Sequence, residues 1–123
     1  MNNRLQRRFC ITLMILGAPW GAALAERHIQ DALNHTEAAV EAAGDSQAIG
    51  QHASEALELM DEAEAANASR PDVLEYLQRG EAELDSAIRN AKRFNSTSAW
   101  KDATDAQRYL EAADQAANGQ PPR

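Results

Sequence analysis

The sequence predicts an all-α fold, an antiparallel up-down four-helix bundle over residues 26–118. Three observations lead to this prediction. Apolar residues recur at steps of three and four from Glu26 to Asn118, which is typical of amphipathic helices. No segment alternates between apolar and polar residues as a half-buried strand does. The breaks between the periodic segments are only a few residues long, and short connections place successive helices antiparallel.

The first two helices are expected over residues 27–43 and 46–66. Gly44 suits the left-handed position that ends many helices, and Asp45 or Ser46 can cap the next one. The apolar stripe of the first helix consists of Ile29, Leu33, Thr36, Val40 and Ala43, and that of the second consists of Ile49, Ala53, Ala56, Met60 and Ala63.

The third and fourth helices are expected over residues 71–93 and 98–117. Pro71 suits a first helical turn, and Ser69 with Asp72 resembles a capping box. The stripes are Val73, Leu77, Leu84, Ile88 and Ala91 in the third helix, and Ala99, Ala103, Ala106, Leu110 and Ala113 in the fourth. Residues 119–123 are expected to be a disordered tail.

The two halves of the bundle look related. Residues 28–43 align with residues 76–91, which pairs Ile29 with Leu77 and Val40 with Ile88. This indicates a duplicated helical hairpin. After residue 25 there are 22 alanines and only 17 large apolar or aromatic residues, so we expect closely packed helices and modest stability. A large share of the packing is expected from the four aromatic residues Tyr76, Phe94, Trp100 and Tyr109.

Residues 1–25 read as a cleaved signal peptide. Three arginines form a positive n-region, residues 9–16 form a short apolar core, and Ala23 and Ala25 supply the small residues of a cleavage site. The apolar run is about half of the ~20 residues that span a bilayer, so no membrane insertion is expected after cleavage. The mature protein is therefore expected to be periplasmic or secreted, by either the general secretory or the twin-arginine route.

Removal of the leader makes the chain more acidic. It takes three of the 12 basic residues and none of the 19 acidic ones, so the formal charge of −7 becomes −10. That charge argues against a nucleic-acid partner, because phosphates repel it. The only cysteine, Cys10, lies in the leader, so the mature chain has neither a disulfide nor a thiolate ligand.

The chain carries no catalytic signature, and we expect it not to be an enzyme. It has no HExxH motif, no Gly-rich phosphate loop and no nucleophile elbow. Acidic runs at residues 61–64 and 81–83 lack the turn and glycine of a calcium loop, and are expected to be solvated helix faces.

The histidines are the candidate metal ligands. His28 and His35 stand seven residues apart, or ~10.5 Å along a helix, which is too far for both to hold one ion. Asp31 lies between them at a spacing suited to chelation with either, and His52 has Glu55 one turn on. If the first two helices pair across the turn at Gly44, then His35, His52, Asp31 and Glu55 converge. Imidazole and carboxylate ligands suit Cu(II), Ni(II) or Zn(II). The alternative is that the histidines face water or pair with neighbouring acids.

Several heptads resemble those of a known family. His28-Ile-Gln-Asp-Ala-Leu-Asn-His35 is similar to the repeat His-x-x-x-Ala-(Leu/Ile)-x-His of the small metal-binding protein family (SmbP) of bacterial periplasms. The segments at Gln51–Leu57, Gly80–Ile88 and Asp105–Gln107 resemble its later heptads. The resemblance implies a four-helix bundle that follows a signal peptide and binds several divalent metals, copper prominently, through many histidines.

This sequence departs from the family repeat at most of the histidine positions. His28, His35 and His52 match, whereas the other repeat positions are occupied by Ala42, Leu59, Glu83, Asn90, Asp105 and Ala112. At these positions the resemblance implies that Glu83 and Asp105 could serve as oxygen ligands, whereas the alanines and the leucine have no atom that binds a metal.

Two function hypotheses follow. The first is an exported protein that binds Cu, Ni or Zn at low capacity, in buffering or resistance. His35 and His52 would be its primary ligands, with His28, Asp31 and Glu55 in support. The second is a non-metal structural or partner-binding bundle of the cell envelope, with an unidentified envelope protein as partner. The loss of repeat histidines favours the second hypothesis, and the retained His28-x-x-Asp31-x-x-x-His35 segment favours the first.

Overall fold

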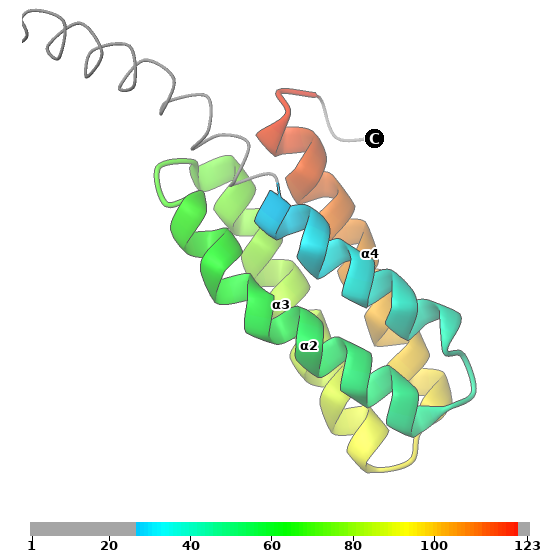
Figure 1. Cartoon of the computed structure of the whole chain (residues 1–123). Helices are drawn as coiled ribbons and strands as arrows, with labels where there is room; N and C mark the ends of the chain where they lie inside the picture. Colours follow the sequence, from blue (N-terminus) through cyan, green and yellow to red (C-terminus); the bar gives the residue numbers. More distant parts are fainter. Residues whose placement is uncertain (1–26, 121–123) are drawn as a thin grey trace, which may run out of the picture.

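A computed structural model describes residues 27–120 and shows the predicted all-α four-helix bundle (Figure 1). The first helix covers residues 27–41 and is followed by α2 (Ser46–Ala66), α3 (Pro71–Lys92) and α4 (Ser96–Ala117). Among the described residues, no helix is long and apolar enough to cross a membrane. The expected signal peptide lies outside the described residues, as do residues 121–123 of the expected tail.

The helices run antiparallel in an up-down order (Figure 1). The turns at residues 42–45 and 93–95 lie at one end of the bundle. The turn between α2 and α3 and the end of α4 lie at the other. The helix α3 packs against both α2 and α4. The bundle therefore consists of two hairpins, one made by the first helix and α2 and the other by α3 and α4.

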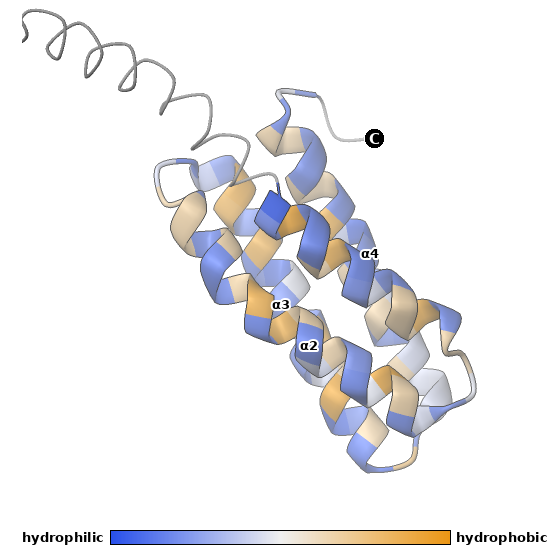
Figure 2. Cartoon of the chain, viewed as in Figure 1, coloured by the Kyte–Doolittle hydropathy of each residue, from blue (hydrophilic) through white to orange (hydrophobic). Residues whose placement is uncertain are grey.

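The apolar stripes form the core, as expected. Figure 2 shows orange apolar positions recurring among blue polar ones along each helix. Every stripe residue predicted for α2 and α4 is buried, while Val40 and Ile88 are partly buried and Ala43 is exposed in the turn after the first helix. The largest fully buried apolar side chains are Ile29, Ile49, Met60, Val73, Leu77, Leu84 and Leu110.

Side-chain caps fix the starts of two helices. The Asp45 carboxylate accepts a hydrogen bond from the Ala48 backbone N–H at 3.0 Å, which confirms it as the cap of α2. The Asn95 side chain accepts from the Ser98 N–H at 3.2 Å in the same way. As a result α4 starts at Ser96, two residues before the predicted start.

The capping box predicted from Ser69 and Asp72 is wrong. Arg70 precedes the first helical residue, Pro71, and no side chain caps this helix start. The Arg70 guanidinium instead donates to the backbone oxygens of Ala116 and Ala117, at 2.7 and 2.9 Å. Free carbonyl groups and a negative dipole end attract a cation to the end of α4, and sequence spacing does not reveal that tertiary contact.

The expected share of packing from the aromatic residues is wrong for Phe94. This side chain is 87% exposed, and its backbone has a positive φ of 57°. Trp100 is 40% exposed, and its indole N–H donates to the Val40 carbonyl oxygen at 3.0 Å. Tyr76 does pack against the core from its edge. Alanine and aliphatic side chains therefore fill most of the interior.

The two hairpins correspond position by position, which supports the predicted duplication. Residues of the first helix correspond to those of α3 with a shift of 48, and residues of α2 correspond to those of α4 with a shift of 50. The second shift pairs the capping residues Asp45 and Asn95, and the positive-φ residues Gly44 and Phe94. The shifts differ by two because α3 continues to Lys92, three residues beyond the position that corresponds to the end of the first helix, while the turn after it is one residue shorter.

Candidate metal site

Two histidines of the first helix contact glutamates of α2. His35 Nδ1 lies 2.9 Å from Glu55 Oε2, and His28 Nδ1 lies 3.3 Å from Glu62 Oε2. The residue numbers of both pairs add up to 90, as expected for two antiparallel helices in one register. Glu62 is not among the ligands predicted from the sequence, although it follows Glu55 by the same seven residues that separate His28 from His35.

A second imidazole joins the pair of His35 and Glu55. His52 stands one turn before Glu55 on α2, and its Nδ1 lies 3.7 Å from Glu55 Oε2. One ligand atom from each of the three side chains lies within 4.8 Å of the other two. This group brings together three of the five predicted ligands, from two helices.

The His52 Nδ1 atom is buried and has no hydrogen-bond partner. A separation of 3.7 Å from Glu55 is too long for a hydrogen bond. A buried polar atom without a partner is costly, and few occur in native proteins. A metal ion that shares the Glu55 carboxylate would satisfy this nitrogen.

The donor set fits a borderline divalent metal. Bonds from imidazole nitrogen or carboxylate oxygen to such metals measure about 2.0–2.2 Å, so donors on one ion lie within about 4.4 Å of each other. The ligand atoms of the three side chains lie within 4.8 Å of one another, so they need to approach by at most a few tenths of an ångström to share an ion. The side chains are 36–41% exposed, which leaves room for this adjustment and for water at the remaining coordination positions.

The structure places the other two predicted ligands outside this group. His28 lies two turns away along the first helix and contacts Glu62. Asp31 is half-buried, and it is not among the three residues whose ligand atoms converge. In the same register the position opposite Asp31 is Leu59, a partly buried side chain that offers no ligand atom.

A group of three carboxylates occupies the corresponding place in the second hairpin. Glu83 corresponds to His35, Asp102 to His52 and Asp105 to Glu55, and their oxygens also lie within 4.8 Å of one another. Burial, followed by repulsion from Asp102 and Asp105, raises the pKa of Glu83.

Contacts within the protein already engage two of these carboxylates. Asp102 accepts hydrogen bonds from the side chains of Ser86 and Asn90, at 2.8 and 2.6 Å. Asp105 pairs with Lys101 at 3.1 Å. The second group therefore has the backbone placement of the first without its imidazole nitrogens, and it provides matched control positions.

Comparison with known proteins gives one finding. The family model described as small metal-binding protein matches residues 3–113, which is most of the chain. Neither the curated proteins nor the solved structures gave a match.

Proposed function

This chain belongs to the small metal-binding protein family, and from that premise we propose that it holds one divalent transition-metal ion between its first helix and α2. His35 and His52 supply imidazole nitrogens, and Glu55 supplies a carboxylate oxygen. The observation that carries the proposal is the convergence of these ligand atoms within 4.8 Å. Cu(II) is expected to bind most tightly, ahead of Ni(II) and Zn(II), because this order holds for most nitrogen and oxygen sites.

Each residue of the site has a separate role. Glu55 faces both histidines and neutralises part of the charge of the ion. The Nδ1 atom of His52 makes no hydrogen bond within the protein, which leaves it available to a metal ion. The two imidazoles favour a borderline transition metal over Mg²⁺ or Ca²⁺, which prefer oxygen ligands alone.

The proposed role is binding, in metal buffering or resistance outside the cytoplasm. A single site gives low capacity, in line with the replacement of most repeat histidines. The basic, then apolar, then small-residue pattern of residues 1–25 supports export to the periplasm. A non-catalytic role is supported by the lack of catalytic motifs in the sequence.

Calorimetric titration of the purified protein with Cu(II), Ni(II) and Zn(II) tests the proposal. We expect one ion per chain, and we expect His35→Gln to weaken binding at least ~100-fold. Changes to groups that only support a ligand already weaken metal binding by about 10–100-fold, and the loss of a ligand should exceed that.

Glu83→Gln is the matched control, because Glu83 holds the corresponding position in the second hairpin. It should leave the affinity and the stoichiometry unchanged. An affinity that His35→Gln does not change would contradict the proposed site.

One observation favours a different function, in which the bundle binds an envelope protein. The second hairpin has kept the backbone of the site and lost its imidazoles, as expected if metal binding has been given up in part. Affinity capture from a periplasmic extract with metal-free protein tests this function. It fails if no specific partner is recovered.

A further inference from the structure

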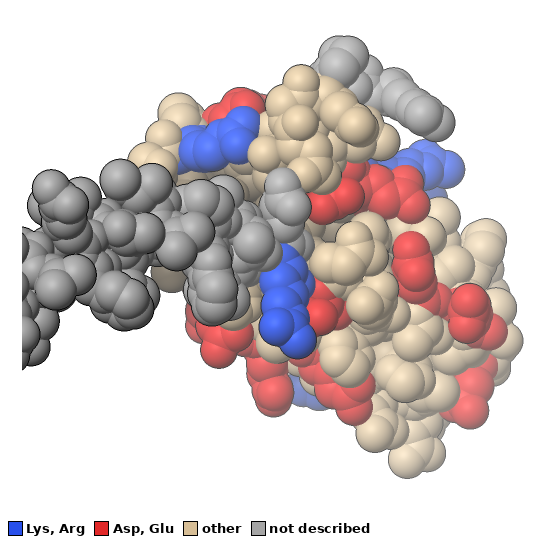
Figure 3. All heavy atoms as spheres, turned by 45° about the horizontal axis from the view of Figure 1, so that its top comes forward, with Lys and Arg blue, Asp and Glu red and all other residues tan. Residues whose placement is uncertain are grey.

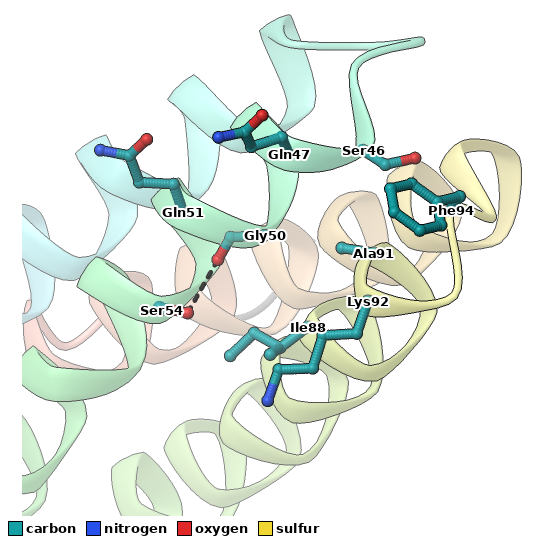
Figure 4. A pocket seen from close by; sticks show the side chains of 9 residues that line it. All are labelled: Ser46, Gln47, Gly50, Gln51, Ser54, Ile88, Ala91, Lys92 and Phe94. Carbon is teal, nitrogen blue, oxygen red and sulfur yellow. Dashed lines mark hydrogen bonds between the residues drawn. The ribbon is translucent and has the colours of Figure 1, made fainter.

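A groove between α2 and α3 lies close to the end of the bundle that carries the turns at residues 42–45 and 93–95. Its volume is about 430 Å³, within the range of small-molecule sites. Figure 4 shows α2 on one side of the groove, α3 on the other, and Phe94 at one end. Its lining includes Gly50, Ser54, Ile88, Ala91, Lys92 and Phe94.

The floor and the walls of the groove are mainly apolar. Gly50 brings α2 so close to α3 that a Cβ atom added to it would lie 2.9 Å from the Ala91 Cβ. Ile88 borders this contact, and Phe94 exposes 87% of its surface beside it. An aromatic side chain exposed at the end of an apolar groove is available to stack on a bound ring.

Lys92 gives this groove an unpaired positive charge. Five of the eight Lys and Arg residues between residues 27 and 120 form ion pairs with carboxylates. Within that part of the chain, the other three, Arg27, Lys92 and Arg93, have no such partner. Acidic side chains are spread over the molecular surface shown in Figure 3, so a free cation beside an apolar groove stands out as a charge that an anionic ligand can complement.

The internal duplication indicates the shape of the ligand. The position in α4 that corresponds to Gly50 is Trp100. Its indole N–H donates to the carbonyl oxygen of Val40, the residue that corresponds to Ile88 in the groove wall. One face of the bundle thus carries an indole at the place where the other face has a glycine and an open groove.

From these observations we propose that the groove binds a small planar aromatic molecule that carries one carboxylate. The ring lies over Gly50 between Ile88 and Phe94, and the carboxylate pairs with the Lys92 ammonium group. A second copy of this chain fits less well. Symmetric docking would bring the unpaired Lys92 and Arg93 of both copies together, and their like charges would repel. The surface area that lines the groove is also far smaller than the area buried in a stable protein interface.

Titration of ¹⁵N-labelled protein with indole-3-acetate, followed by amide chemical shifts, tests this proposal. Neutral indole serves as the uncharged comparison. We expect saturable shifts at Gly50, Ser54 and Ala91, with a dissociation constant on the order of 1 mM for a ligand of this size. Lys92→Gln should weaken indole-3-acetate about fivefold and leave indole unchanged, because an exposed ion pair contributes up to about 1 kcal/mol.

Two further variants make the test specific. Arg93→Gln removes the neighbouring unpaired charge, which does not line the groove, and should change neither affinity. Phe94→Gly removes the stacking surface and should weaken both probes by about threefold or more.

Three results would overturn the proposal. The first is the absence of saturable shifts at the groove, and the second is an equal effect of Lys92→Gln and Arg93→Gln on the affinity for indole-3-acetate. The third is a set of amide shifts that change with protein concentration in the absence of any probe, which would indicate that a second copy of the chain occupies the groove. The titration is carried out without metal, so its outcome is independent of the site at His35, His52 and Glu55.

Discussion

Phe94 and Gly44 hold corresponding positions in the two hairpin turns, and both have left-handed backbones, with φ of 57° and 90°. A side chain in this conformation costs about 1–2 kcal/mol, whereas glycine adopts it freely. We predict that Phe94→Gly raises the free energy of unfolding by about 0.5–1 kcal/mol, because part of the gain is offset by the more flexible unfolded chain. Urea denaturation followed by circular dichroism measures this change.

The first turn offers the reverse substitution as a control. Gly44→Ala should lower the free energy of unfolding by about 1 kcal/mol, since nothing packs within 4 Å of the added Cβ and only the backbone strain remains. A loss of stability in Phe94→Gly would show that the exposed ring makes contacts that stabilise the fold.

Glu64 makes stability depend on pH. A hydrogen bond to Glu81, then burial, then repulsion from Glu81 and Asp61 raise its pKa from 4.5 to about 7. The folded protein therefore holds a proton that the unfolded chain releases above its lower pKa. The contribution of this group to stability is full below about pH 4.5, falls between pH 4.5 and 7, and is lost above pH 7.

We predict that Glu64→Gln unfolds at a higher urea concentration than the parent at pH 8 and at a similar one at pH 5. The amide retains a hydrogen-bond donor for Glu81 without the charge that pH 8 imposes. Glu75→Gln, in the exposed pair with Arg79, is the control and should show the same small effect at both pH values. An equal effect of Glu64→Gln at both pH values would argue against a shared proton.

For individual residues, the sequence predicts the helix caps well and the packing of the aromatic side chains poorly. The Asp45 carboxylate accepts a hydrogen bond from the backbone N–H three residues later, so its role as a cap follows from the local sequence. Phe94 and Trp100 are both large aromatic residues, and their different environments depend on the turn conformation and on a contact with Val40, 60 residues away.

The contact between α2 and α3 depends on the small size of Gly50. A Cβ atom there would lie 2.9 Å from the Ala91 Cβ, a separation that requires the helices to move apart. We predict that Gly50→Ala lowers the melting temperature despite the higher helix propensity of alanine, because overpacking typically costs about 1–3 kcal/mol. Differential scanning calorimetry tests this.

Two further variants separate overpacking from other causes. Ala91→Gly in the Gly50→Ala background should recover part of the loss by removing the opposing Cβ. Gly80→Ala meets the flexible end of Leu110 at 3.2 Å and should cost less than Gly50→Ala. An unchanged melting temperature in Gly50→Ala would mean that α2 and α3 already have room for a methyl group.

Helix positions follow closely from the sequence because local signals fix them. All ten stripe residues predicted for α2 and α4 are buried, since the helical period places them on one side. The start of α3 is the exception. Arg70 contacts the end of α4, so its role depends on how the chain folds back over more than 40 residues.

At the scale of the molecule, the length of the first turn creates the candidate site. The turn sets the register that places His35 opposite Glu55 and His28 opposite Glu62. Once the helices are known to pair across Gly44, the sequence predicts His35, His52 and Glu55 together. The sequence alone does not exclude Asp31 from the set of ligands, because only the register of the two helices shows that Asp31 lies opposite Leu59, which offers no ligand atom.

The duplication places both proposed sites. The His35 group and the Glu83 group are corresponding positions with different chemistry, and so are Gly50 and Trp100. Each hairpin has kept the same backbone while its surface side chains have changed. This explains why the scaffold is easier to predict from the sequence than the ligands.

Pulsed electron paramagnetic resonance of the protein loaded with one equivalent of Cu(II) identifies the ligands. If the ion binds between the first helix and α2, the spectrum will show two coordinated imidazoles. His52→Gln will then reduce them to one, and His28→Gln will leave both. A spectrum with no imidazole, or one in which His28→Gln removes a ligand and His52→Gln does not, would contradict a metal site at His35, His52 and Glu55.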